Sequence, residues 1–432
     1  MDLPAPSLKT GAPGDALHPE TLAIAHGYDP HACFGAAKPP LIPTSTFVYR
    51  SAQHARDAHA AFFGGSGPAP GDEAGYIYAR LDHPNLGMVQ RRLAALDGAE
   101  DAAAFASGMA AVSAILLAFA RPGDAVLQTR PMYGGVDWLL GTQLAEFGIR
   151  AVPIEDALSE ASAAAAAEAA TRQGPVALIM AETPANPTAG IADIAMLART
   201  ADVIGRHQGR RPLLVVDNTF LGPFLQAPLR FGADLCLTSL TKYAGGHSDL
   251  LAGGVSGSAA LVGVLKRLRT MLGSPLDAHG CWLLLRSFET MALRTERACA
   301  NAERIATFLR EHPKVAGVTY LGFLPEGSAG RAVYARQCGG AGSTFSFTLH
   351  AGDGGGETEA FRLLDALRVL RLAVSLGGTE TLICHPASTT HYPVPRERRE
   401  AMGIQDGTLR VSVGLEHADD LVRDLARALE AV

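Results

Sequence analysis

The 432-residue sequence lacks any apolar stretch long enough to span a bilayer, and the apolar run at 110–120 is well short of the roughly 20 residues required. The N-terminus also lacks the basic-then-apolar pattern of a secretory signal. These two absences predict a cytoplasmic protein with no membrane partner.

Other patterns are missing as well. The six cysteines form no CxxC pair, so neither disulfides nor a metal site is expected. The net charge is −6 and the basic residues are not gathered into runs, which argues against nucleic acid as a partner. No GxGxxG follows a first strand, so the fingerprint of a nicotinamide dehydrogenase is absent.

The length and the 48% hydrophobic content are ample for a large core and more than one domain. Residues 1–75 have few periodic segments and predict an N-terminal arm, with a turn-rich loop at 64–75. Strands alternate with helices over 76–275, which predicts an α/β domain with a mostly parallel sheet. Residues 276–432 predict a smaller α+β domain, with long helical patterns at 281–309 and 418–431.

One lysine stands at a strand end where ligands bind in α/β proteins. The segment LCLTSLTKYAGG begins as a short apolar strand at Leu235, continues into hydroxyl residues and then reaches Lys242. No acidic neighbour in the segment pairs with the amine, and Ser239 and Thr241 could bind an anion. A neutral lysine amine in such a place suits attack on a carbonyl.

A carboxylate stands at the end of another strand. The apolar run Leu213–Val216 ends in Asp217, Asn218 and Thr219. Taken singly, Lys242 could be a surface lysine and Asp217 a turn or cap residue. Together they match the needs of pyridoxal phosphate, which is held through its aldehyde and keeps its ring nitrogen protonated by a carboxylate.

A third segment could bind the phosphate. A short buried strand is predicted at 102–105, followed by the small residues 106–108 and an apolar helix at 109–119. A small-residue turn that starts a helix exposes backbone N–H groups at the positive end of the helix dipole. An ordinary strand-to-helix turn would look the same.

These segments resemble the Cys/Met-metabolism family of pyridoxal-phosphate enzymes, which includes cystathionine γ-synthase and γ-lyase, methionine γ-lyase and the O-acylhomoserine sulfhydrylases. The resemblance runs from about Leu22 to the C-terminus. It rests on the motifs KPPLIPTSTFVY, YARLDHPN, ASGMAA, ETPANPT, VVDNTF, SLTKYAGGHSD, RSFETMALR, AVSLGGTETLICHPAS and GTLRVSVGLEH. It implies fold type I, with a seven-stranded-type sheet in the large domain, and pyridoxal 5'-phosphate as the cofactor.

The resemblance also implies roles for individual residues. Lys242 would bind the cofactor covalently and later shuttle protons, and Tyr133 would stack on the ring and could act as a base. The remaining cofactor contacts would be Ser107, Gly108, Met109, Ser239 and Thr241 at the phosphate, Asn186 at the 3-oxygen, and Asp217 with Thr219 at the ring nitrogen.

Further residues would act on the substrate or across a subunit boundary. Ser375 and Arg410, which precedes the apolar strand Val411–Val413, would hold the substrate's α-carboxylate. Tyr78 and Arg80 would reach the phosphate of a neighbouring subunit. Self-association into a dimer that shares active sites, and into a tetramer, is therefore expected, with a small amino acid as the substrate.

The reaction implied is γ-elimination on a γ-substituted L-amino acid, as in methionine γ-lyase, with a sulfur- or oxygen-linked leaving group. Two departures from the family bear on the substrate. Val374 stands where cystathionine-processing members carry a glutamate, and Gly135 stands where methionine γ-lyases usually carry a cysteine.

Two alternatives remain at this point. One is γ-replacement, of the cystathionine γ-synthase or O-acylhomoserine sulfhydrylase type. The other is a catalytically silent relative that binds the cofactor without turnover.

Overall fold

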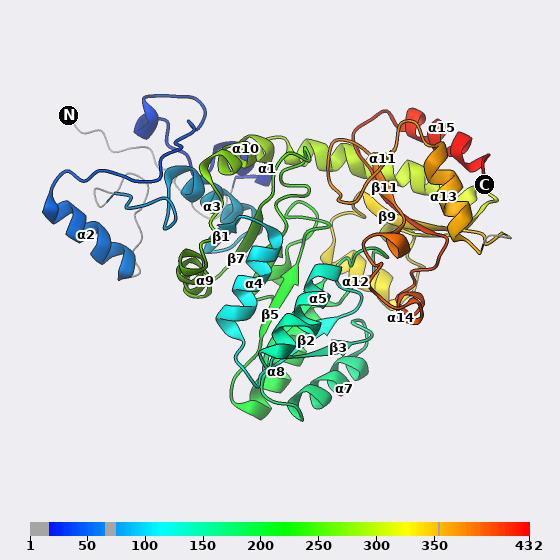
Figure 1. Cartoon of the computed structure of the whole chain (residues 1–432), viewed down its shortest axis with the longest axis horizontal. Coiled ribbons are helices and arrows are strands. Elements are labelled where there is room, and N and C mark those ends of the chain that lie inside the picture. The colour runs from blue at the N-terminus through cyan, green and yellow to red at the C-terminus, as the bar shows by residue number, and fades with distance from the viewer. Residues whose placement is uncertain (1–16, 65–74, 353–354) are drawn as a thin grey trace.

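The computed structural model describes residues 17–64, 75–352 and 355–432, so most of the expected loop at 64–75 lies outside the described residues. Within the described part, no helix combines the length and the apolar character that crossing a membrane requires. Two sheets organise the chain, a seven-stranded one with strands between residues 101 and 257 and a five-stranded one with strands between residues 315 and 412 (Figure 1).

The larger sheet has the strand order β1-β7-β6-β5-β4-β2-β3. Neighbouring strands from β6 to β3 run parallel, and only β7 pairs antiparallel, with both β1 and β6. The expected mostly parallel sheet of fold type I is therefore confirmed. Its strands are β1 Asp101–Phe105, β2 Ala125–Thr129, β3 Arg150–Ile154, β4 Val176–Glu182, β5 Leu213–Asp217, β6 Leu235–Thr238 and β7 Gly253–Gly257.

Fifteen helices in the described residues surround and connect the sheets. They are α1 Pro19–Ala25, α2 Ala52–Phe63, α3 Pro84–Asp97, α4 Gly108–Phe119, α5 Gly134–Gly141, α6 Gln143–Glu146, α7 Glu160–Thr171, α8 Ile194–Gln208, α9 Ala259–Leu272, α10 Ala278–Phe288, α11 Met291–Glu311, α12 Ala329–Gln337, α13 Glu357–Ala366, α14 Arg396–Ala401 and α15 Ala418–Leu429.

Helices cover both faces of the larger sheet because its strands are apolar on both sides. On β5, Val215 packs into the core formed with α4 and α9, whereas Leu214 and Val216 pack into the core formed with α7 and α8. Alternate residues of a strand point to opposite faces, so an unbroken apolar run is what a sheet covered on both sides requires.

The smaller sheet has the order β10-β11-β12-β9-β8, and α11, α13 and α15 pack against it with their buried residues. The 281–309 pattern is two helices, since α10 ends at Phe288 and α11 begins at Met291. The two sheets lie on either side of the predicted boundary at 275/276, and the domain bounds themselves stay a prediction. The strands are β8 Val315–Thr319, β9 Thr344–Leu349, β10 Arg371–Leu372, β11 Leu382–Cys384 and β12 Thr408–Ser412.

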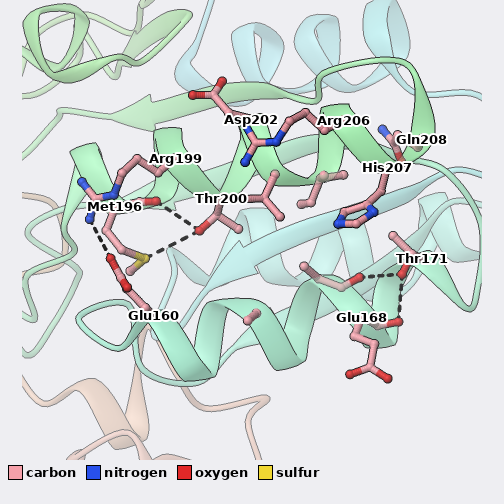
Figure 2. Close-up of a pocket in the computed structure, with 14 residues that line it drawn as sticks. Glu160, Glu168, Thr171, Met196, Arg199, Thr200, Asp202, Arg206, His207 and Gln208 are labelled. Carbon is pink, nitrogen blue, oxygen red and sulfur yellow. Dashed lines mark hydrogen bonds and ion pairs between the residues drawn. The ribbon is translucent and has the colours of Figure 1, made fainter.

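An open groove of about 870 Å³ lies between α7 and α8 (Figure 2). Ala164 and Ala167 of α7 face Met196 and Val203 of α8 there, and the short alanine side chains leave the space between the helices unfilled. The rim is charged, with Arg199 bound to Glu160 at 2.9 Å.

Candidate active site

A cavity of about 650 Å³ lies outside the carboxyl ends of β4, β5 and β6, between the larger sheet and the C-terminal region. In an α/β sheet this is the edge where ligands bind. All of the predicted site residues except Tyr78 and Arg80 line it. They are Ser107, Gly108, Met109, Tyr133, Asn186, Asp217, Thr219, Ser239, Thr241, Lys242, Ser375 and Arg410.

Lys242 follows β6 in a turn and its amine points into this cavity. Its Nζ donates a hydrogen bond to Ser375 Oγ at 2.9 Å. Burial, and then the positive charge of Arg410, hold the pKa of the lysine below its usual range. A larger share of the amine is therefore neutral, and so nucleophilic, at a given pH.

Asp217 is the last residue of β5 and its carboxyl group is fixed by the next turn. Oδ1 accepts a hydrogen bond from the N–H of Thr219 at 2.9 Å, and Thr219 Oγ1 accepts one from the N–H of Ser239 at 2.8 Å. Burial raises the pKa of Asp217. A cation at the ring nitrogen of a ligand would favour its ionised form.

Glu182, the last residue of β4, also lines the cavity, and the sequence reasoning missed it. Its carboxyl group accepts hydrogen bonds from two backbone N–H groups, those of Tyr133 and Asn186. Burial, and then the neighbouring charge of Asp217, raise the pKa of Glu182. The signal was available, because Glu182 ends an apolar run just as Asp217 does.

The start of α4 forms a cradle of small groups. Ser107 is the N-cap, and its Oγ accepts a hydrogen bond from the N–H of Ala110, while the earlier N–H groups of the helix have no intrahelical acceptor. A Cβ at Gly108 would lie only 3.2 Å from Ser239 Cβ, so glycine lets the turn approach the Ser239 hydroxyl closely without displacing that side chain.

Of the Ser239 and Thr241 hydroxyls, both expected at the phosphate, that of Thr241 has backbone partners. Its Oγ1 donates to the carbonyl of Ala252 at 3.1 Å and accepts from the N–H of Ala252 at 2.9 Å. The hydroxyl of Ser239 is the one that faces the α4 cradle.

Arg410 lies within β12 rather than before a strand as expected, and this strand carries its guanidinium to the cavity. Nη1 donates to Asn186 Oδ1 at 3.0 Å and Nη2 donates to the carbonyl of Ser375 at 2.6 Å. Nε is buried and has no hydrogen-bond partner among the described residues. The backbone of Ser375 is left-handed, with φ of 83°, and this turn presents its hydroxyl to Lys242 and its carbonyl to Arg410.

Tyr133 caps α5 and its side chain is 44% exposed. A Cβ added at Gly135 would lie 2.7 Å from Cε1 of the Tyr133 ring and 3.2 Å from Met109 Sδ. The ring therefore occupies space that any side chain at position 135 would need.

Tyr78 and Arg80 do not line the cavity. They lie beside each other, with the guanidinium 5.7 Å from the ring centroid, and Arg80 Nη1 donates to the carbonyl of Thr270 at 2.8 Å. Tyr78 is 42% exposed.

The cavity therefore suits a phosphorylated aromatic aldehyde. The small-residue cradle at α4 is open to an anion, a nucleophilic amine faces the cavity centre, and a carboxyl group lies on a separate strand end. The unpartnered Nε of Arg410 leaves one more donor available to an anionic group.

The model of the family described as Cys/Met metabolism PLP-dependent enzyme matches residues 20–430. L-Methionine γ-lyase of Pseudomonas putida is 40% identical over 415 residues, covering 95% of this chain and 97% of the relative. Cystathionine γ-lyase of Bacillus subtilis is 37% identical over 366 residues, covering 84% of this chain and 91% of the relative.

Among solved structures, cystathionine γ-synthase from Xanthomonas oryzae pv. oryzae, in complex with aminoacrylate and cysteine, matches with a TM-score of 0.83 and 34% identity. The match covers 96% of this chain and 98% of that structure. The likeness thus includes both sheets.

Proposed function

The chain belongs to the Cys/Met-metabolism family of PLP-dependent enzymes, and on that premise we propose that it catalyses γ-elimination on a γ-substituted L-amino acid. The products would be a 2-oxo acid, ammonia and the protonated γ-group, with one water consumed. The observation that carries the proposal is the contact of the Lys242 amine with Ser375, beside the guanidinium of Arg410, in one buried cavity.

The protein uses pyridoxal 5'-phosphate as its cofactor. We assign the phosphate to the cradle at the start of α4 with Ser239 and Thr241, the ring nitrogen to Asp217, and the 3-oxygen to Asn186. Tyr133 would cover a face of the ring. When bound, the cofactor supplies an electron sink for bonds broken at the substrate's α- and β-carbons.

Arg410 would hold the substrate's α-carboxylate and so aim the α-hydrogen at Lys242. A guanidinium that can use its unpartnered Nε together with an Nη binds a carboxylate at two points. Lys242 Nζ would then take the proton from the α-carbon, because its lowered pKa increases the share of neutral amine that can act as a base.

The wall beyond Lys242 supports an uncharged leaving group. Leu251 and Val374 are apolar, and Thr389 and Thr390 offer only hydroxyl and backbone groups. Val374 is 52% exposed, and its side chain offers no ionic partner to a charged terminus such as the ammonium of cystathionine. Sulfur- or oxygen-linked groups without charge fit better.

The second candidate is γ-replacement, in which a thiol takes the place of the leaving group. The close structural likeness to a cystathionine γ-synthase supports it. Uncharged O-acyl groups would fit the same apolar wall as a methylthio group.

Self-association is proposed as well. Tyr78 and Arg80 lie outside their own cavity, and Figure 1 shows the arm with α2 standing away from the body of the chain. Apolar side chains on this arm are strongly exposed, among them Phe34, Val48 and Phe63. A second copy would bury them and bring Arg80 to a neighbouring phosphate. The cytoplasmic location stays a prediction.

The test incubates the purified holoenzyme with methionine, homocysteine, cystathionine, O-acetylhomoserine and O-succinylhomoserine, with and without an added thiol. The released γ-group, ammonia and 2-oxobutanoate are quantified. Ammonia and 2-oxobutanoate without thiol would establish elimination. A γ-substituted product that forms only with thiol would establish replacement and overturn the elimination proposal.

A further inference from the structure

We propose that Glu182 is a positioning residue that fixes Tyr133 and Asn186, the two groups assigned to the ring face and the 3-oxygen of the cofactor, relative to each other. The inference rests on those proposed roles. It does not depend on which reaction the enzyme catalyses.

The location of Glu182 follows from the register of two parallel strands. Glu182 ends β4 and Asp217 ends β5, and the two are register partners. Adjacent residues in register point to the same side of a sheet, so both carboxyl groups reach the same end of the cavity. Asp217 is assigned to the ring nitrogen, which leaves Glu182 beside the ring edge without a cofactor role of its own.

The contacts of Glu182 give it a different role. Oε2 accepts the N–H of Tyr133 at 2.5 Å, and Oε1 accepts the N–H of Asn186 at 2.8 Å. Tyr133 precedes α5, whereas Asn186 lies in the loop after β4, so these two segments approach the cavity separately. One carboxyl group joins them. Both carboxyl oxygens are used, one for each segment.

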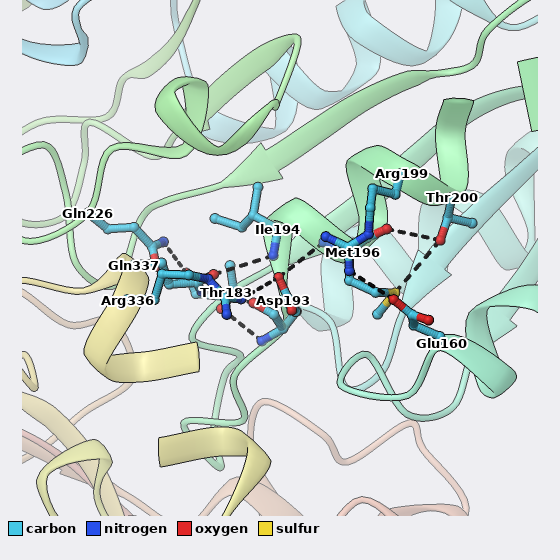
Figure 3. A network of polar contacts seen from close by, with 11 residues as sticks. Glu160, Thr183, Asp193, Ile194, Met196, Arg199, Thr200, Gln226, Arg336 and Gln337 are labelled. Atoms are coloured by element: carbon cyan, nitrogen blue, oxygen red, sulfur yellow. Dashed lines mark hydrogen bonds and ion pairs between the residues drawn. The ribbon is translucent and has the colours of Figure 1, made fainter. Parts of the chain in front are cut away.

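The backbone next to Glu182 is restrained by hydrogen bonds to the residues that follow the two strand ends. Figure 3 shows Gln226 beside Thr183, the residue that follows Glu182. Gln226 Nε2 donates to the carbonyl of Thr183 at 2.7 Å and to Oδ1 of Asn218, the residue that follows Asp217, at 3.0 Å. One buried amide thus ties the ends of both strands together. These bonds restrain the backbone next to Glu182.

Glu182 accepts hydrogen bonds from the segments that carry Tyr133 and Asn186. It would therefore fix the positions of these two residues around the cofactor ring to within a fraction of an ångström. Misplacement of a reacting group by about 1 Å can cost on the order of 100-fold in rate. Glu182 should therefore affect kcat and the asymmetric protein environment that gives the bound ring its circular dichroism. It should affect the affinity for the cofactor less.

The test is the Glu182→Gln holoenzyme, which keeps the size of the side chain but replaces one acceptor with a donor that faces a backbone N–H. We expect the visible circular dichroism of the bound cofactor to weaken clearly, and kcat to fall about 10- to 100-fold, with a smaller change in KM. The dissociation constant for pyridoxal 5'-phosphate should rise less, because Lys242 and the phosphate contacts remain.

The matched control is Asp97→Asn. Asp97 is also a buried carboxyl group, it accepts a hydrogen bond from Ser256 Oγ at 2.5 Å, and it does not line the cavity. Its visible dichroism and kcat should match the parent enzyme. Should Glu182→Gln fail to fold, Glu182→Asp, which keeps the carboxyl group but shortens its reach, provides the same measurements.

Parent-like dichroism and kcat in a folded Glu182 variant would overturn the inference, as would an equal change in Asp97→Asn. Dichroism reports the ring environment even if the parent proves inactive on every γ-substituted amino acid. Failure of the proposed reaction is therefore distinguishable from failure of this inference.

Discussion

Two hollows in this molecule differ in what surrounds them more than in size. The groove between α7 and α8 measures about 870 Å³ and the cavity around Lys242 about 650 Å³. Two helices build the groove, whereas the cavity collects strand ends, a helix start and segments of the C-terminal region that lie far apart in the sequence.

The charged groups of the groove and of the cavity also differ in their exposure to solvent and in their pKa values. In the groove, Arg199 and Glu160 pair with 60% and 76% of their side chains exposed, and such pairs contribute about 0–1 kcal/mol. In the cavity, Lys242 and Asp217 are half-buried and their pKa values are displaced, the first downward and the second upward. Volume alone therefore does not identify the site. Converging, desolvated polar groups do.

The largest expected effect comes from removing the Lys242 amine, which tests whether the cavity and not the groove is the active site. Lys242→Ala should lower 2-oxo acid formation by at least about 1,000-fold, because both the covalent attachment and the proton transfer are lost. Borohydride trapping followed by peptide mass spectrometry should find no cofactor at position 242. Lys266→Ala, which loses only a pairing with Asp101, is the control and should stay within about twofold of the parent. Equal activity in Lys242→Ala would refute the site.

The next largest effect is expected at Arg410, which is proposed to bind the substrate's α-carboxylate. Arg410→Lys keeps the charge but loses the fork that binds Asn186 Oδ1 and the Ser375 carbonyl, so kcat/KM should fall about 10- to 100-fold. Initial rates over a range of substrate concentrations give this ratio. A kcat/KM within twofold of the parent would mean that another group holds the carboxylate.

A smaller effect is expected where the Tyr133 ring meets Gly135. Gly135→Ala places a methyl group 2.7 Å from the present position of Tyr133 Cε1, so the ring must move. Because the ring is half exposed it can do so, and we expect a change of up to about 10-fold in kcat/KM with little change in thermal stability. Steady-state kinetics and a melting curve measure both. An unaltered kcat/KM would show that the ring position is free to vary without cost.

The displaced lysine pKa gives a prediction in pH. Burial and Arg410 lower the pKa of Lys242, so in cofactor-free protein the neutral amine appears at a lower pH than for a free lysine. The rate of pyridoxal 5'-phosphate attachment should therefore rise with pH through a midpoint below that of an exposed lysine. In Arg410→Gln the midpoint should move upward. Trapping the adduct at timed intervals across pH gives the profile, and a midpoint at the ordinary lysine value would contradict the prediction.

The smallest effect is expected in the groove. Ala164→Leu fills part of it, and kcat/KM should remain within about twofold of the parent, with a stability change within about 1 kcal/mol. Arg199→Ala should behave likewise. Chemical denaturation and the 2-oxo acid assay measure these. A large loss of activity in either variant would make the groove part of the functional machinery and remove the contrast with the cavity.

Much of the site could be predicted from the sequence because its residues follow short apolar runs. Asp217 and Lys242 come at or just after strand ends, and Ser107 at a helix start, and each position has a local signal. Arg410 was placed before a strand but lies within β12, because the strand was predicted only from the apolar run Val411–Val413. The break between α10 and α11 at Glu289 and Thr290 was missed because neither residue is a strong helix breaker.

The sequence by itself determined the elements, the family and the chemical character of the residues, because these follow from local periodicity and motif order. Only the tertiary structure decided that Glu182 joins Tyr133 to Asn186, that Ser375 faces Lys242, and that Tyr78 and Arg80 stand outside their own cavity. These are contacts between residues as much as 133 positions apart. Strand order and register set them, and no local pattern encodes which strand ends become neighbours.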